Sequence, residues 1–159
     1  MNSTKLLLPY RLKKWGWILT LPSFFAGILF LATDGIDPAW LNIKTLAIIG
    51  EKDGSLIGDT AFLIFMENNL ADEFIAGALM LGLLFLCFTR EKIEDEYISQ
   101  IRWESMLWAV YTQMIVFIVA LFTIYGMPFW TFMLVNMFLL PIFFVVRYYW
   151  KLFTLKREG

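Results

Sequence analysis

Four long apolar runs, separated by polar segments, divide the 159-residue chain. They cover residues 15–32, 71–88, 105–125 and 128–148. Each has close to the ~20 residues that a helix needs to cross the hydrocarbon core at about 1.5 Å per residue. Lipid offers backbone groups no hydrogen-bond partner, so a spanning segment forms its own bonds as a helix. The pattern predicts an all-α membrane protein, a four-helix transmembrane bundle forming a single membrane domain over residues 1–159.

The connections between the runs differ in length. Spans three and four are separated by about two residues around Gly126, so they should form a tight antiparallel hairpin. Residues 33–70 separate spans one and two. Within them, Thr45–Ile49 and Thr60–Met66 are rich in β-branched, aliphatic and aromatic residues, and glycines lie between the two runs. This arrangement predicts a short external β-hairpin between the first two helices.

The polar connection between spans two and three is strongly charged. Residues 90–104 contain no Gly or Pro, so we expect a cytoplasmic helix that continues into span three. One interpretation is a solvated amphipathic helix stabilised by local ion pairs. Alternatively, it is a docking element for a partner. The residues that would bind the partner are Glu91, Glu94, Asp95, Glu96 and Arg102.

Polar segments rich in Lys and Arg alternate along the chain with segments that have few, and this alternation predicts how the protein is oriented in the membrane. Eleven of the thirteen Lys and Arg residues lie before span one, between spans two and three, or from the last turn of span four onward. Cytoplasmic loops of membrane proteins carry an excess of Lys and Arg. Both termini and the central loop are therefore expected in the cytoplasm, and the segment 33–70 outside.

Composition excludes several classes of function. A hydrophobic content of 60% with only 17% charged residues exceeds what a soluble domain of this length can bury. The chain has no histidine, and its single cysteine, Cys87, lies in an apolar run. Histidine-bound metals, bis-histidine haem and Ser/His or Cys/His catalysis therefore lack an essential group. We expect no cofactor. The basic segments suit anionic lipid, and no arginine-rich stretch with interleaved aromatics indicates nucleic acid.

A second cluster of acidic residues lies where the external segment meets span two. Asn69 followed by Asp72 and Glu73 is typical of a helix N-cap with an acidic first turn. The alternative is that Glu67, Asp72 and Glu73 gather a hard cation such as Ca²⁺. Their spacing does not match an EF-hand loop.

Two amides lie within the apolar runs, Gln113 on span three and Asn136 on span four. Counted from the tight turn at about 1.5 Å per residue, they come within reach of each other if they share a face. One interpretation is an interhelical hydrogen bond worth about 0.6 kcal/mol. The other is the polar lining of a pore or pocket.

Three stretches carry a resemblance: residues 8–17 (LPYRLKKWGW), the positions Asn69, Asp72 and Glu73, and Glu94-Asp95-Glu96 followed by Ile98, Ile101, Arg102 and Ser105. They are similar to a pattern in uncharacterised small bacterial four-span integral membrane proteins. Some of those proteins resemble products encoded beside helix-turn-helix regulators, which implies membrane-linked signalling in the bacterial inner membrane. The resemblance assigns no catalytic residue.

These observations rank three functions. The first is a non-enzymatic signalling or accessory subunit that binds a protein partner through its acidic cytoplasmic helix. The second is a small homo-oligomeric channel or transporter lined by Gln113 and Asn136. The third is an enzyme acting on lipid through the external carboxylates Glu67 and Asp72.

Overall fold

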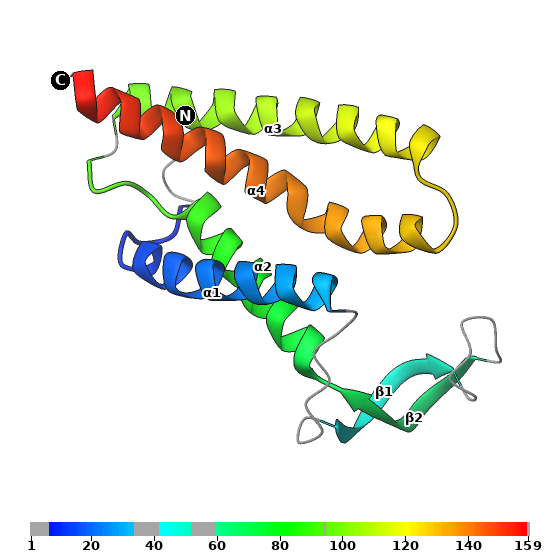
Figure 1. Ribbon diagram of the computed structural model, residues 1–159. Coiled ribbons are helices and arrows are strands. Elements are labelled where there is room, and N and C mark those ends of the chain that lie inside the picture. The colour runs from blue at the N-terminus through cyan, green and yellow to red at the C-terminus, as the bar shows by residue number, and fades with distance from the viewer. Residues whose placement is uncertain (1–6, 34–41, 52–59, 94, 159) are drawn as a thin grey trace. The chain divides into compact units, whose positions relative to one another are not determined.

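The computed structural model describes residues 7–33, 42–51, 60–93 and 95–158. Its elements, in chain order, are α1 (Leu12–Ala32), β1 (Asn42–Glu51), β2 (Thr60–Asn69), α2 (Ala71–Phe88), α3 (Glu96–Thr123) and α4 (Met127–Glu158) (Figure 1). They fall into two compact units. The first unit lies within Met1–Thr20 and Met80–Gly159, and the second comprises Leu21–Leu79.

All four expected spans are helical, except that α3 ends at Thr123, two residues before the expected end of the third span. Four helices are long and apolar enough to cross a membrane, which supports a multi-pass membrane protein. α3 and α4 exceed the expected spans, with 28 and 32 residues. At 1.5 Å per residue they are about 42 and 48 Å long, against about 30 Å of hydrocarbon. The beginning of α3 and the end of α4 therefore extend beyond the apolar runs.

In the first unit, α3 and α4 pack as an antiparallel hairpin (Figure 1). α3 ends at Thr123 and α4 begins at Met127, as the short connection predicted. Gly126 makes this turn with a φ of 73°, a left-handed conformation that is costly for residues with a Cβ. The end of this hairpin opposite the turn brings the start of α3 beside the end of α4.

The first part of α1 lies close against the last part of α2 in the same unit. A Cβ built on Gly82 would lie 2.7 Å from the backbone nitrogen of Thr20 and 3.1 Å from the carbonyl oxygen of Gly16. One built on Gly16 would lie 2.9 Å from a methyl carbon of Leu86. Small residues on both helices thus allow the two backbones to approach, as small residues do between membrane helices.

The helix expected over residues 90–104 is shorter than predicted and begins at Glu96. Thr89 and Leu8 form a parallel β-bridge, in which the amide of Arg90 donates to the carbonyl of Leu8. This extended pairing excludes helix at those residues. The side chain of Asp95 then accepts a hydrogen bond from the amide of Glu96 and caps α3. The absence of Gly and Pro is compatible with a helix here, but the pairing of this backbone with the N-terminal segment prevents it.

The second unit contains the expected β-hairpin between the first two helices. β1 and β2 pair antiparallel, with Leu46 opposite Phe65 and Ile49 opposite Phe62. Both strands are longer than predicted. β2 continues to Asn69, opposite Asn42, and α2 begins at Ala71 after one turn residue. Asn69 therefore ends a strand two residues before α2, and its side chain, which was expected to cap that helix, lies outside the described residues.

Candidate binding site at the basic end of the first unit

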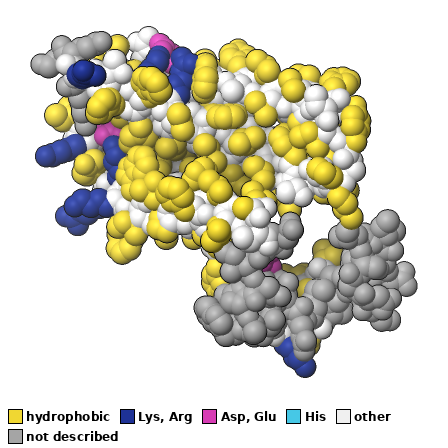
Figure 2. All heavy atoms as spheres, viewed as in Figure 1, with side chains coloured by type: hydrophobic (Ala, Val, Ile, Leu, Met, Phe, Trp, Pro, Cys, Tyr) yellow, Lys and Arg dark blue, Asp and Glu magenta, His cyan; other side chains and the backbone are white. Residues whose placement is uncertain are grey.

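Three basic segments that are far apart in the sequence meet at one end of the first unit. We call this the basic end, formed by residues 7–14, 89–104 and 147–157. The amide of Leu8 donates to the carbonyl of Phe88, which fixes the N-terminal segment against the α2–α3 connection. Figure 2 shows most of the dark-blue Lys and Arg side chains at one end of the helices, while yellow apolar side chains cover much of the remaining helical surface on this face.

Lys13 on α1 makes the first set of contacts that stabilise the basic end. Its Nζ lies 2.5 Å from Oε1 of Glu91, and the two side chains are only 17% and 10% exposed. The same Nζ lies 4.6 Å from the centre of the Tyr149 ring, within the range of a cation–π contact. Trp17 packs edge-on against Tyr149. The ion pair and the ring contacts connect α1, the α2–α3 connection and α4.

Arg102 on α3 makes the second set of contacts at the basic end. From α3 its guanidinium donates to the carbonyl of Thr89 at 3.3 Å and to the hydroxyl of Tyr148 at 3.1 Å. It also lies 5.2 Å from the Tyr148 ring, a side chain that is only 1% exposed. In return, Arg147 from α4 lies over the ring of Trp108 on α3 at 4.8 Å. Each helix thus places an arginine on an aromatic ring of the other.

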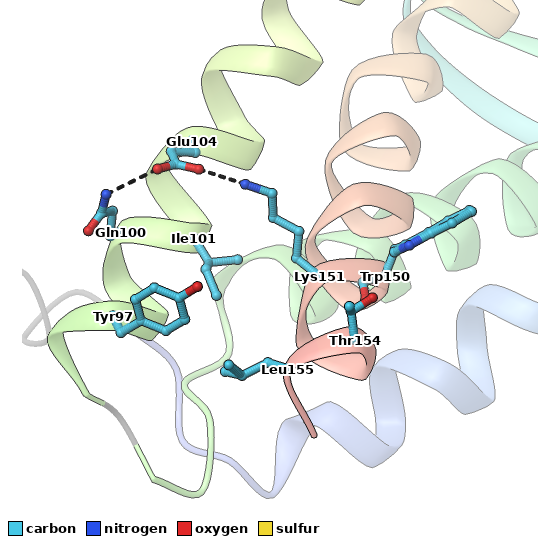
Figure 3. A pocket seen from close by; sticks show the side chains of 8 residues that line it. All are labelled: Tyr97, Gln100, Ile101, Glu104, Trp150, Lys151, Thr154 and Leu155. Carbon is cyan, nitrogen blue, oxygen red and sulfur yellow. Dashed lines mark hydrogen bonds and ion pairs between the residues drawn. The ribbon is translucent and has the colours of Figure 1, made fainter. Parts of the chain in front are cut away.

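Beyond these contacts, the ends of α3 and α4 enclose a groove of about 340 Å³ (Figure 3). Nζ of Lys151 bridges the groove to Oε2 of Glu104 at 2.6 Å, and the Gln100 amide donates to the other carboxylate oxygen at 3.1 Å. These hydrogen bonds hold the pKa of Glu104 below its ordinary value, and the bond from Lys151 has the larger effect. The groove is lined by Tyr97, Gln100, Ile101, Glu104, Trp150, Lys151, Thr154 and Leu155.

The lining is amphipathic. Tyr97 and Ile101 from α3 face Leu155 from α4, and Trp150 extends outward from the rim (Figure 3). Tyr97 is 54% exposed and Trp150 is 73% exposed. Tyrosine and tryptophan are the residue types that most often anchor protein interfaces, because they bury much apolar area and keep a polar group. The groove can therefore take an apolar side chain beside a pair of charges.

None of the expected partner-binding residues that the structure describes lines this groove, and most of them have other contacts. Glu91 pairs with Lys13, Asp95 caps α3 and Arg102 packs on Tyr148. Glu94 lies outside the described residues. Glu96 is exposed in the first turn of α3. Two of the acidic residues that singled out this segment, Glu91 and Asp95, therefore stabilise the fold.

The two intramembrane amides come together as the spacing predicted. Nε2 of Gln113 lies 2.5 Å from Oδ1 of Asn136 and 3.3 Å from its carbonyl oxygen. Gln113 is only 8% exposed. The structure thus contains the interhelical hydrogen bond between α3 and α4, one of the two interpretations of this pair.

The expected cation ligands lie in the second unit. The backbone of Glu67 pairs with that of Lys44 in the hairpin, and its side chain lies outside the described residues. Asp72 and Glu73 are exposed in the first turn of α2. Among the described residues, no three acidic or sulfur side chains are placed to hold a metal ion.

Sequence reasoning missed the groove, although one signal for it was present. Tyr97, Gln100, Ile101 and Glu104 follow the i, i+3, i+4, i+7 spacing that places residues on one helix face. The residues of the other wall, from Trp150 to Leu155, belong in the sequence to the basic segment after span four. Only the pairing of α3 with α4 shows that these two faces meet.

No family model matches the chain, and no curated protein or solved structure is significantly similar to it.

Proposed function

We propose that the chain is a non-enzymatic signalling or accessory subunit of a bacterial inner membrane. It binds a protein partner in the groove between the start of α3 and the end of α4. The basic end faces the cytoplasm, in agreement with the excess of Lys and Arg in cytoplasmic segments. The observation that carries this proposal is the groove itself, which combines exposed Tyr97 and Trp150 with the Glu104–Lys151 ion pair.

The position of the groove supports a protein partner. Its walls lie on the parts of α3 and α4 that extend past the apolar runs, so a soluble segment of another protein can reach it. Its charges are already paired with each other, and this leaves the exposed aromatic and aliphatic groups to supply binding energy. An amphipathic helix of the partner, with an apolar stripe and flanking charges, has the complementary chemistry.

The channel alternative has less support from the same unit. A pore lining requires amides that face an open path, whereas Gln113 is buried and donates to Asn136. The pair thus contributes to the packing of α3 against α4. A path formed between several copies would have to be lined by other residues or break this bond.

The test is co-purification of the full chain in mild detergent at native expression, with mass spectrometry of the bound proteins. The variant is Tyr97→Ala with Trp150→Ala, which removes both exposed aromatic groups of the groove. The matched control is Trp103→Ala with Phe153→Ala. These residues are similarly exposed on α3 and α4 but do not line the groove.

We expect a specific partner with the wild type and the control, and its loss from the groove variant. A partner that stays bound to the groove variant contradicts the proposed surface. Recovery of the chain alone in all three samples contradicts the accessory role. In that case, solute flux in proteoliposomes, with Asn136→Leu as the variant, tests the channel.

A further inference from the structure

The β-hairpin of the second unit exposes large apolar side chains on both of its faces. Leu46, Ile48 and Phe65 lie on one face, and the pair Ile49 and Phe62 lies on the other. Their exposed fractions range from 53% to 75%. A hairpin in water normally keeps at least one polar face, and two strands without support are marginally stable. This hairpin therefore needs an apolar environment around it.

The hairpin is joined directly to a membrane span. β2 ends at Asn69 and α2 begins at Ala71, so only Leu70 separates them. The chain leaves the membrane after α1 and enters it again with α2, so both helix ends and the hairpin belong to the same membrane surface. A single residue extends about 3.5 Å at most, which keeps the base of β2 at that surface.

The helices of the same unit also expose large apolar side chains. Phe74, in the first turn of α2, is strongly exposed, and Phe25, Ile28 and Leu29 are exposed along α1. On helices long and apolar enough to cross a membrane, such side chains face lipid. The hairpin, joined to α2 through Leu70, has exposed Phe, Ile and Leu side chains of the same kind.

We infer that the hairpin lies in the interfacial layer of the bilayer, where its apolar side chains contact lipid. Lipid can surround an inserted element on both faces, whereas a second hairpin stacked on it would cover only one. The outer edges of a two-stranded sheet have unpaired N–H and C=O groups, which require water or headgroups. The headgroup–acyl boundary satisfies both requirements, and the hydrocarbon core does not. Lys44, at the base of β1, suits the phosphate level of the same layer.

This inference does not depend on the partner groove, and it can be tested with site-specific probes because the chain has only one cysteine. In a Cys87→Ala background, an environment-sensitive nitrobenzoxadiazole group is attached to Phe65→Cys or Ile48→Cys on one face. Phe62→Cys or Ile49→Cys places it on the other. Each full-length protein is reconstituted in vesicles of phosphatidylcholine with or without brominated acyl chains. Ile115→Cys, exposed on α3, is the lipid control, and Lys92→Cys, exposed at the basic end, is the aqueous control.

We expect brominated lipid to reduce the fluorescence of probes on both hairpin faces, as for Ile115→Cys, and aqueous iodide to have little effect. Strong iodide quenching without bromine quenching, as for Lys92→Cys, overturns the inference and leaves the hairpin in water. Protection from both quenchers with energy transfer between labelled copies also overturns it, in favour of a second copy. Two positions on each face ensure that one poorly folded variant does not decide the result.

Discussion

Nζ of Lys13 lies 2.5 Å from Oε1 of Glu91, although 78 positions separate the two residues. The bond joins the first turn of α1 to the connection between α2 and α3, where Leu8 also pairs with Thr89. Because both side chains are largely buried, neither charge has full access to water. The pair therefore holds the N-terminal segment against the end of the bundle that carries the groove.

Removing one member of this pair should destabilise the protein. We expect Lys13→Ala to cost about 1–3 kcal/mol, because it leaves the Glu91 carboxylate buried without its partner. Thermal unfolding in detergent measures the loss. The neighbouring exposed Lys14→Ala is the control and should change stability by less than about 0.5 kcal/mol. Equal effects of the two variants would show that the ion pair contributes nothing.

Arg102 should be a structural residue. Arg102→Ala removes the hydrogen bonds to Thr89 and Tyr148 and the cation–π contact, for an expected loss of about 2–3 kcal/mol. Tyr148→Phe keeps the ring and removes only the hydroxyl contact, so it should cost about half as much. Arg90→Ala, with an exposed side chain, is the control. If Arg102→Ala melts like the wild type and only loses a bound partner, its side chain acts on the partner instead.

The contact between α1 and α2 should not tolerate a methyl group at Gly82. A Cβ there meets the Thr20 backbone, so Gly82→Ala must separate the helices and should cost about 1–3 kcal/mol. Gly77→Ala on the same helix is a matched control, since nothing lies within 4 Å of its Cβ position. We expect it to be neutral or slightly stabilising. An unfolding assay in which Gly77→Ala is less stable than Gly82→Ala would contradict this packing.

The amide pair within the membrane should contribute modestly to stability. Gln113→Leu and Asn136→Leu should each cost about 0.6 kcal/mol, and at most about 1.7 kcal/mol. Because they remove the same hydrogen bond, the double variant should cost less than the sum of the two. Unfolding in mixed micelles measures this double-mutant cycle. Strict additivity would mean that the two side chains do not interact in the membrane.

The apolar runs and the turn-forming residues of the sequence predicted most of the architecture. The run at residues 71–88 coincides with α2, Gly126 makes the predicted turn, and the β-rich runs pair as a hairpin between the first two helices. These features are local, because they depend on the partition of one segment between lipid and water or on the φ of one residue. The meeting of Gln113 with Asn136 also followed from the sequence, since a turn of three residues fixes the register of α3 against α4.

The roles at the basic end were decided only by tertiary structure. By sequence Glu91 and Arg102 belong to one charged stretch, yet folding gives each a separate distant partner, Lys13 for Glu91 and Tyr148 for Arg102. The groove between Glu104 and Lys151 likewise depends on which faces of α3 and α4 meet, and the short turn that pairs the two helices does not show this. The physical reason is that a membrane helix is apolar on every side, so its hydrophobic pattern shows that it enters lipid but does not mark the face that packs.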